Sequence, residues 1–285
     1  MAPSQRSNIV GVAPTTGLVA RDGIIPLSNR QDTVGPCART VKCAAHILTA
    51  ISGKSMYDNA TQSIPFKSIP RYSEACRGTR LDGMRIGVPR NAIKDVDKVI
   101  LEHFERALKL LESAGAILTD VKFSSAEEWS KWDAASKRAC LQAEFKHSIE
   151  GWLESLVENP NELHSLSDII NFTKTDSRES YPQRDIQRWE WIKDGPEYNS
   201  LEYKEFLEKM YRLSGEQGII GAMDEHQLDV IAYPTNTDPA TTFTARLGLP
   251  AITVPLGFYP KDTTPISHRG DIYNVAPNVP LVFYR

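Results

Sequence analysis

Short motifs that mark common catalytic and metal sites are missing from this sequence of 285 residues. Its four cysteines have neither a Cys-x-x-Cys spacing nor the density of a disulfide scaffold, which predicts free thiols. Its six histidines form no His-Glu-x-x-His motif or other short ligand pair, so no metal site is expected. A Gly-x-Ser-x-Gly elbow and a Ser-x-x-Lys motif are also absent, which argues against the serine sites of α/β-hydrolases and β-lactamases.

Excess charge of one sign and long apolar runs are lacking as well. The chain carries 33 basic and 36 acidic residues, a net charge of −3, which argues against nucleic acid or an anionic membrane as the main partner. No apolar run approaches the roughly 18 residues that span a bilayer, and the N-terminus shows no signal-peptide pattern. We therefore expect a cytoplasmic protein with no nucleic-acid or membrane partner.

One stretch resembles part of a nucleotide-binding motif. Ser52-Gly53-Lys54-Ser55 matches the end of a phosphate-binding loop, but Leu48 stands where that motif needs glycine. The run also ends a helical pattern instead of opening one, so the backbone cradle for phosphate is missing. We interpret it as the end of a helix and expect no cofactor.

The remaining composition is that of a globular protein, with 41% hydrophobic and 24% charged residues. Apolar residues at helical spacing follow Thr40, few hydrophobic residues lie in 54–80, and residues 124–216 are mostly helical by pattern. We expect one partial domain with five segments: a turn-rich start at 1–53, a surface crossing at 54–80, a βαβ unit at 81–123, an α-rich layer at 124–227 and C-terminal strands at 228–285.

The βαβ unit is the clearest local pattern. Strand Met84–Val88, an amphipathic helix over 97–114, Gly115 and a strand around Ile117–Val121 follow one another at the spacing of a parallel pair with a crossover helix. The late strands 229–233 and 251–254 are too apolar to stand alone in water, so we expect them to join the same, mostly parallel sheet. The predicted class is α/β, with a mixed, largely parallel sheet covered by helices and an α-rich middle layer.

Several segments together resemble the amidase-signature hydrolases. Asn8-Ile9-Val10-Gly11 through Pro14-Thr15 resembles the family's Gly-x-x-Gly-x-x-Pro-Thr element, and the stretch from Gly17 to Val41 resembles the segment that follows its catalytic serine. Gly83–Pro89, Asp229–Thr235 and Gly248–Tyr259 resemble later strands of that family, and the ending Pro255-Leu256-Gly257-Phe258-Tyr259-Pro260 is most similar to fungal members. The resemblance implies an incomplete amidase-signature core and hydrolysis of carboxamide carbon–nitrogen bonds.

The resemblance also implies that the catalytic residues are missing. The family uses a serine nucleophile, a second serine and a lysine, all upstream of the pair that matches Pro3-Ser4, so none of them matches a residue of this sequence. The family pattern also continues beyond Arg285. We expect a chain truncated at both ends, with no catalytic residue of its own and no activity alone.

Thr235 and Asn236 are the candidate substrate-binding residues. They follow the apolar strand Val230–Tyr233 at its carboxyl end, where open α/β sheets place ligands, and the resemblance puts this loop near the acyl pocket. A simple strand-ending turn is the other interpretation. All five tryptophans lie between Trp129 and Trp191, where they either line a substrate tunnel or pack between helices.

Three interpretations of the function stay open. By resemblance the chain is an amidase-family protein acting on a small amide if missing segments complete it. Alternatively, it is a non-catalytic binding module or one half of a split amidase, with a complementing N-terminal half as its partner. The third possibility is an amidase of secondary metabolism whose gene boundaries are wrongly set. We also expect Ile9–Val12, Ile86–Val88 and Ile252–Val254 to lack neighbours, which favours self-association.

Overall fold

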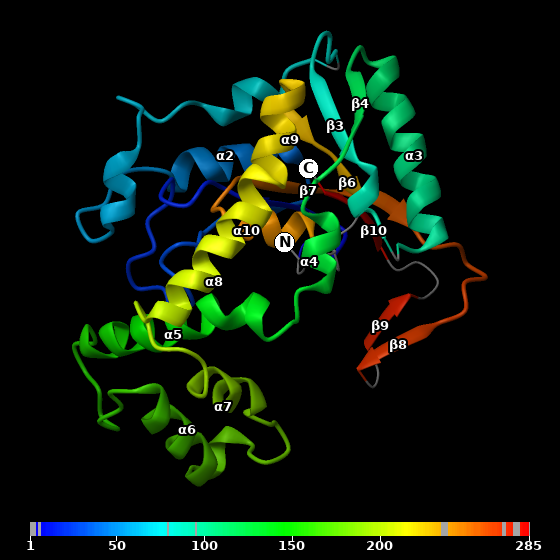
Figure 1. The fold of residues 1–285 in the computed structure, drawn as a ribbon. Helices are drawn as coiled ribbons and strands as arrows, with labels where there is room; N and C mark the ends of the chain where they lie inside the picture. The colour runs from blue at the N-terminus through cyan, green and yellow to red at the C-terminus, as the bar shows by residue number, and fades with distance from the viewer. Residues whose placement is uncertain are drawn as a thin grey trace.

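The structure of the chain is a computed structural model. This structure describes residues 4, 7–78, 80–94, 96–234, 239–269, 272–275 and 280–284, and it describes side chains through residue 266. Helices surround two separate sheets, and a helical layer extends to one side (Figure 1). The expected mixed α/β class is thereby confirmed.

The larger sheet has five strands in antiparallel pairs. Its order is β2-β1-β7-β10-β6, and its members are β1 (Val10–Ala13), β2 (Cys37–Ala38), β6 (Tyr233–Pro234), β7 (Ala251–Phe258) and β10 (Pro280–Tyr284). A separate antiparallel hairpin of β8 (Ile266–Arg269) and β9 (Ile272–Val275) lies between β7 and β10 in the chain and projects to the lower right in Figure 1.

The smaller sheet is parallel and confirms the predicted βαβ unit. Its order is β4-β3-β5, from β3 (Arg85–Pro89), β4 (Ile117–Val121) and β5 (Val230–Ile231). The crossover is α3 (Lys98–Ser113), which begins after Asp97 because that side chain accepts from the Val99 amide. It ends before Gly115 at φ +105, where an added Cβ would lie 2.3 Å from the Asp82 carboxylate.

Both faces of the parallel sheet are covered by helices. Phe104 and Leu108 of α3 pack on Ile86 and Val88 from one face. On the other face, α9 (Ile219–His226) packs into a core that includes Val121. A parallel strand buried on both faces must be apolar throughout, which explains the continuous apolar pattern of β3.

The expectation of one mostly parallel sheet is wrong. Strand β5 continues the parallel sheet, but β7 pairs with β1 and β10, both antiparallel to it. The segment between β7 and β10 contains a hairpin, and strands joined in that way lie antiparallel, whereas a parallel pair needs a crossover. The expected lack of neighbours is also wrong for β1, β3 and β7, since each lies between two other strands. Half-buried residues of the three predicted segments are Ile9, Val12, Ile252 and Val254.

The α-rich segment follows prediction. It contains α4 (Ala126–Lys131), α5 (Ser136–Glu154), α6 (Leu166–Thr175), α7 (Gln187–Lys193) and α8 (Leu201–Tyr211), and a π-helical turn at Arg212–Glu216 leads to α9. Helices α6 and α7 lie farthest from the sheets (Figure 1). Trp129 meets Phe243 edge-on at 4.8 Å between ring centroids, and Trp152 and Trp189 pack on the α5–α6 core, so helix packing accounts for these three.

Shorter elements make up the rest of the described chain. Helix α2 (Val41–Ile51) is capped by Thr40 and ends at Ser52, which agrees with the helix-end interpretation of 52–55. The crossing contains short 3₁₀ turns at Asn59–Ser63 and Tyr72–Cys76, and others lie at Arg90–Ala92 and Ser177–Glu179. Helix α10 (Ala240–Arg246) links β6 to β7. In the part of the chain that the structure describes, no helix combines the length and apolar composition that crossing a bilayer requires.

Candidate substrate-binding site

Thr235 and Asn236, the predicted substrate contacts, lie outside the described residues. Their described flanks are Pro234 at the end of β6 and Ala240 at the start of α10. Tyr233 is 1% exposed and its hydroxyl donates to the Ala92 carbonyl, which fixes the end of β6 in the core. The prediction for the pair stays untested, and α10 is the next described element along the chain.

A pocket of about 370 Å³, with polar side chains set among apolar ones, lies between α10 and the loop that follows β1. The loop contributes Thr16, Gln31 and Thr33, and the helix contributes Thr241, Thr242, Thr244 and Arg246. We call this space the threonine pocket. Sequence analysis did not find it, because its hydroxyls come from segments more than 200 residues apart along the chain.

Two glycines let the loop pack closely, one against the end of α10 and the other against the 3₁₀ turn at Asn59–Ser63. The Thr16 amide donates to the Gly248 carbonyl at 3.1 Å, and Gly248 has φ +63. A Cβ at Gly248 would lie 2.8 Å from Thr16 Oγ1, while a Cβ at Gly17, φ +89, would lie 2.7 Å from the Ala60 carbonyl oxygen. Both positions therefore need glycine for its small size and its left-handed backbone.

The pocket wall has more hydrogen-bonding capacity than the described chain satisfies. Thr244 Oγ1 donates to the Ala240 carbonyl at 2.7 Å. The Oγ1 atoms of Thr16 and Thr33 are inaccessible to solvent and have no hydrogen-bond partner among the described residues. Among the described residues, the Gln31 amide makes one long contact, 3.5 Å from Nε2 to Ser28 Oγ. Gln31 therefore has amide donors and an acceptor for a polar ligand.

A buried carboxylate behind the pocket ties the loop to the helical layer. Glu144 of α5 is 4% exposed and accepts from Arg30 Nε at 2.9 Å, from the Tyr203 hydroxyl at 3.1 Å and from the Ser28 hydroxyl. Arg30 also donates to the Arg246 carbonyl at the end of α10. These contacts join the loop, α5, α8 and α10, and we call Ser28, Arg30, Glu144 and Tyr203 the Glu144 cluster.

Burial keeps the Tyr203 hydroxyl and the Cys140 thiol, both near Glu144, protonated. Desolvation raises the pKa of Tyr203, and the Glu144 charge raises it further. Desolvation also raises the pKa of the buried Cys140 thiol to about 11. Because the thiolate is the reactive form, Cys140 is not a nucleophile at neutral pH. All four cysteines are free thiols.

The described lining of the threonine pocket brings no nucleophile and base together. Among its described lining residues there is no serine, cysteine, histidine or lysine, so no nucleophile and base lie together. Its hydroxyl, amide and guanidinium groups form hydrogen bonds with neutral polar groups such as a carboxamide. No group of three His, Cys, Asp or Glu side chains that could hold a metal occurs among the described residues.

A salt bridge between Arg21 and Asp58 fixes another part of the loop that follows β1. We expect it to make the free energy of unfolding depend on pH in the acid range. Asp58 is bound by Arg21 through Nε at 2.8 Å and Nη2 at 2.9 Å, and it accepts from the Arg21 and Ala60 amides. The Arg21 hydrogen bond, against the opposing effect of burial, lowers the pKa of Asp58 from 3.8 to about 2.

A carboxyl with a lowered folded pKa stabilises the fold above its unfolded pKa and loses that effect as the pH falls through its folded pKa. Asp58→Asn should therefore cost about 1–2 kcal/mol of unfolding free energy at pH 6, and the difference from the parent should vanish between pH 4 and 2. Urea unfolding at several pH values measures it. Asp22→Asn is the control, since Asp22 is an exposed carboxylate of the same loop. A difference that is constant with pH would contradict this assignment.

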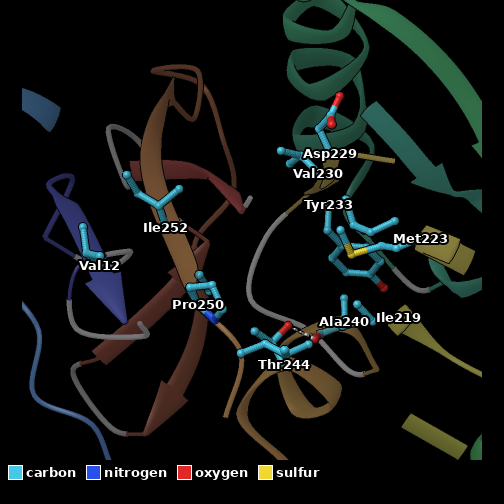
Figure 2. Close-up of a pocket in the computed structure, with 13 residues that line it drawn as sticks. Val12, Ile219, Met223, Asp229, Val230, Tyr233, Ala240, Thr244, Pro250 and Ile252 are labelled. Carbon is cyan, nitrogen blue, oxygen red and sulfur yellow. Dashed lines mark hydrogen bonds between the residues drawn. The ribbon is translucent and has the colours of Figure 1, made fainter. Parts of the chain in front are cut away.

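A second hollow of about 360 Å³ is apolar and adjoins the threonine pocket. The two spaces share Thr244, Leu249 and Ala251. Figure 2 shows Val12 and Ile252 on one side of this hollow and Val230 and Tyr233 across from them. A mostly apolar space with a few polar side chains at one end is the general form of a site for a small organic ligand.

Comparison with known sequences identifies the relatives of this fold. Residues 2–267 match the sequence model of the amidase family. An amidase homologue from Arthroderma benhamiae is 36% identical over 99% of this chain and 47% of its own length. The A subunit of the glutamyl-tRNA(Gln) amidotransferase of Natronomonas pharaonis is 36% identical over 44% of this chain and 29% of its own length.

Solved structures agree with these matches. The peptide amidase of Stenotrophomonas maltophilia is 30% identical with a TM-score of 0.81, over 99% of this chain and 55% of that one. An amidase family protein of Bacillus anthracis is 26% identical with a TM-score of 0.75, and the match covers 99% of this chain and 51% of that one. The chain thus spans about half the length of the relatives it matches. The sequence motifs, the fold and these matches together show that the chain belongs to the amidase family.

Proposed function

We propose that this chain is the substrate-holding part of an amide hydrolase and that these 285 residues alone do not cleave amides. The observation that carries the proposal is the composition of the threonine pocket. Its described walls carry hydroxyl, amide and guanidinium groups but no nucleophile beside a base. The reaction class, hydrolysis of a carboxamide carbon–nitrogen bond, comes from the family.

Amide hydrolysis needs groups that this sequence does not match. A serine must attack the carbonyl carbon, a base must take the serine proton, and N–H donors must stabilise the tetrahedral oxyanion. In serine hydrolases the oxyanion hole and substrate binding alone leave about 10³–10⁴-fold acceleration. The family's oxyanion donors lie in the same unmatched segment as its serine, so we expect not even this residual rate.

The residues of the chain itself account for binding. In the proposal, the Gln31 amide pairs with the substrate carboxamide, with the donor of each meeting the acceptor of the other. Thr242 from α10 adds a hydroxyl across the pocket. Arg246 lines the same space and is held by its own bond from Nη2 to the Lys137 carbonyl at 2.7 Å. The Glu144 cluster holds the loop that carries Gln31.

The alternative function is one half of a split amidase, in which a second polypeptide supplies the catalytic residues. Two observations favour it. The chain covers about half the length of its relatives, and apolar spaces lie open between its two sheets. In this case the pocket described above binds the same substrate, and only the completed pair turns it over.

Binding without turnover is the expected result when the chain meets a neutral carboxamide. Ligand-detected NMR with N-acetylalaninamide should show saturable binding to the threonine pocket. Gln31→Met keeps the side-chain length but removes the amide, and we expect binding about 2–10-fold weaker because one or two hydrogen bonds are lost. Thr244→Val is the matched control, since that hydroxyl is already committed to the Ala240 carbonyl. Equal binding by the parent and by Gln31→Met would refute the pocket assignment.

A further inference from the structure

Gln31 is the side chain through which the threonine pocket can tell one kind of hydrogen-bonding ligand from another. The threonine hydroxyls of the described lining rotate, so each can donate to a ligand or accept from it. The Arg246 guanidinium can only donate. A carboxamide has an acceptor at one end and donors at the other, and turning it over exchanges the two ends. The end of Gln31 that meets a ligand therefore decides whether the pocket selects a ligand with an N–H group.

A turn in the loop after β1 places Gln31 beside Ser28. The backbone amides of Gln31 and Asp32 donate to the Ser28 carbonyl at 3.1 and 2.9 Å. The Asp32 carboxylate closes the turn, since its Oδ2 accepts from the amides of Leu27 and Ser28 at 2.7 and 2.8 Å. These bonds bring the two side chains together, with Nε2 of Gln31 at 3.5 Å from Ser28 Oγ.

The Glu144 carboxylate takes the single hydroxyl proton of Ser28. Oε1 of Glu144 lies 2.9 Å from Nε of the Arg30 guanidinium, and a carboxylate in such a pair accepts hydrogen bonds and donates none. The Ser28 hydroxyl is therefore the donor in its contact with Oε2 of Glu144. Because Ser28 is buried and its proton is committed, its oxygen presents only lone pairs to Gln31.

The lone pairs of Ser28 determine which way the Gln31 amide is turned. With Nε2 toward Ser28, an N–H group faces a lone pair, whereas the opposite orientation would set Oε1 against it, acceptor against acceptor. Ser28 is not among the described residues that line the threonine pocket, but Gln31 is. The Nε2 end thus points away from the pocket, and Oε1 is the end left for a ligand.

We propose that Ser28, held by Glu144, is a positioning residue that fixes the Gln31 amide and thereby makes the threonine pocket select carboxamides over esters. The inference rests on the proposed function, since it concerns the ligand of the same pocket. A carboxamide offers an N–H group to Oε1 of Gln31 and a carbonyl to the second hydrogen of Nε2. An ester has no N–H group, so it sets an oxygen lone pair against Oε1. Ser28 acts only through Gln31 and touches no ligand.

A comparison of two ligands on the full chain tests the proposal. N-acetylalaninamide and N-acetylalanine methyl ester differ only in the terminal group, a carboxamide in one and an ester in the other. Titration by ligand-detected NMR should give a Kd about 3–10-fold lower for the amide, which is the effect of about one hydrogen bond. Gln31→Met should remove this preference. Equal affinity of the parent for the two ligands would overturn the proposal and leave the proposed function standing.

Variants separate positioning by Ser28 from a merely structural role. Ser28→Ala frees the Gln31 amide and should abolish the preference for the amide, and Ser28→Thr, which keeps the hydroxyl, should restore it. Tyr203→Phe removes another hydroxyl bonded to Glu144 without touching Ser28, so it should weaken both ligands by the same factor and keep the ratio of the parent. A parental ratio in Ser28→Ala would overturn the proposal. Thermal melts by circular dichroism show whether each variant folds.

Hydrogen exchange at the Gln31 side chain tests the same point without a ligand and without a change at Ser28. Its side-chain amide signal in a heteronuclear NMR spectrum is identified by its loss in Gln31→Met. One Nε2 hydrogen should exchange with solvent more slowly than the other, because it is bonded to buried Ser28. Equal exchange of the two hydrogens would mean that the amide is not fixed and would overturn the proposal. A chain that binds neither ligand would disprove the proposed function, and unequal exchange in that chain would leave the positioning of Gln31 by Ser28 standing.

Discussion

Replacing Glu144 with alanine is expected to lower the free energy of unfolding by about 3–5 kcal/mol. The carboxylate is 4% exposed and accepts from Arg30, Tyr203 and Ser28. Its removal leaves the Arg30 charge and two hydroxyls without their acceptor in a buried region, and that loss costs far more than the pair contributes when intact. Because native domains are stable by only about 5–15 kcal/mol, a large fraction of the stability would be lost.

Two further variants separate the effect of losing the buried charge from the effect of changing any residue of helix α5. Glu150→Ala changes an exposed residue of the same helix α5 and should alter stability by less than about 0.5 kcal/mol. Glu144→Gln keeps an acceptor for Tyr203 but loses the charge opposite Arg30, so its effect should fall between the other two. Urea unfolding measures all three. If Glu144→Ala were as stable as Glu150→Ala, the cluster would not hold the loop.

Ile86→Asp is expected to unfold the chain. Ile86 is 2% exposed in the central strand of the parallel sheet and packs in one cluster with Phe104 and Leu108 of α3. An aspartate there must bury an unpaired carboxylate or stay protonated, and either state costs several kcal/mol in addition to the lost packing. Circular dichroism and hydrogen exchange should show the loss of the protected amides of β3.

The neighbouring position gives a contrasting result. Arg85 is 41% exposed and lies 3.5 Å from the Asp229 carboxylate, which also accepts from the Arg85 amide. Arg85→Glu replaces an attraction in solvent with a repulsion, so it should cost no more than about 1 kcal/mol. A folded Ile86→Asp, or an unfolded Arg85→Glu, would mean that the pleat of β3 is wrongly assigned.

Local structure was predictable where the signal lies within one segment. The crossover helix and its two strands followed from the apolar stripe of 97–114 and from Gly115. The helix after Thr40 followed from the helical spacing of its apolar residues. Such features depend on neighbours within about twenty residues, so their pattern is visible in the sequence.

Arrangements that join distant segments were not predictable in the same way. The sequence of β7 is equally suited to a parallel or an antiparallel neighbour, and its partners β1 and β10 are set by the whole fold. Glu144 has no sequence mark that distinguishes it from the exposed Glu150, because its partner Arg30 lies 114 residues away. For the same reason the threonine pocket, built from the loop after β1 and from α10, was missed, and the prediction of Thr235 and Asn236 as substrate contacts stays untested.

Treatment of the purified chain with a serine-directed fluorophosphonate, together with an assay of ammonia release from aliphatic and aryl amides, tests the central claim most directly. An activated serine forms one stoichiometric adduct that intact-mass spectrometry detects, whereas ordinary serines do not react. We predict no adduct and no ammonia above the buffer blank, because the described lining of the threonine pocket holds no nucleophile beside a base. A single adduct at one serine, formed as ammonia release is abolished, would show that the chain is a complete amidase and contradict the account.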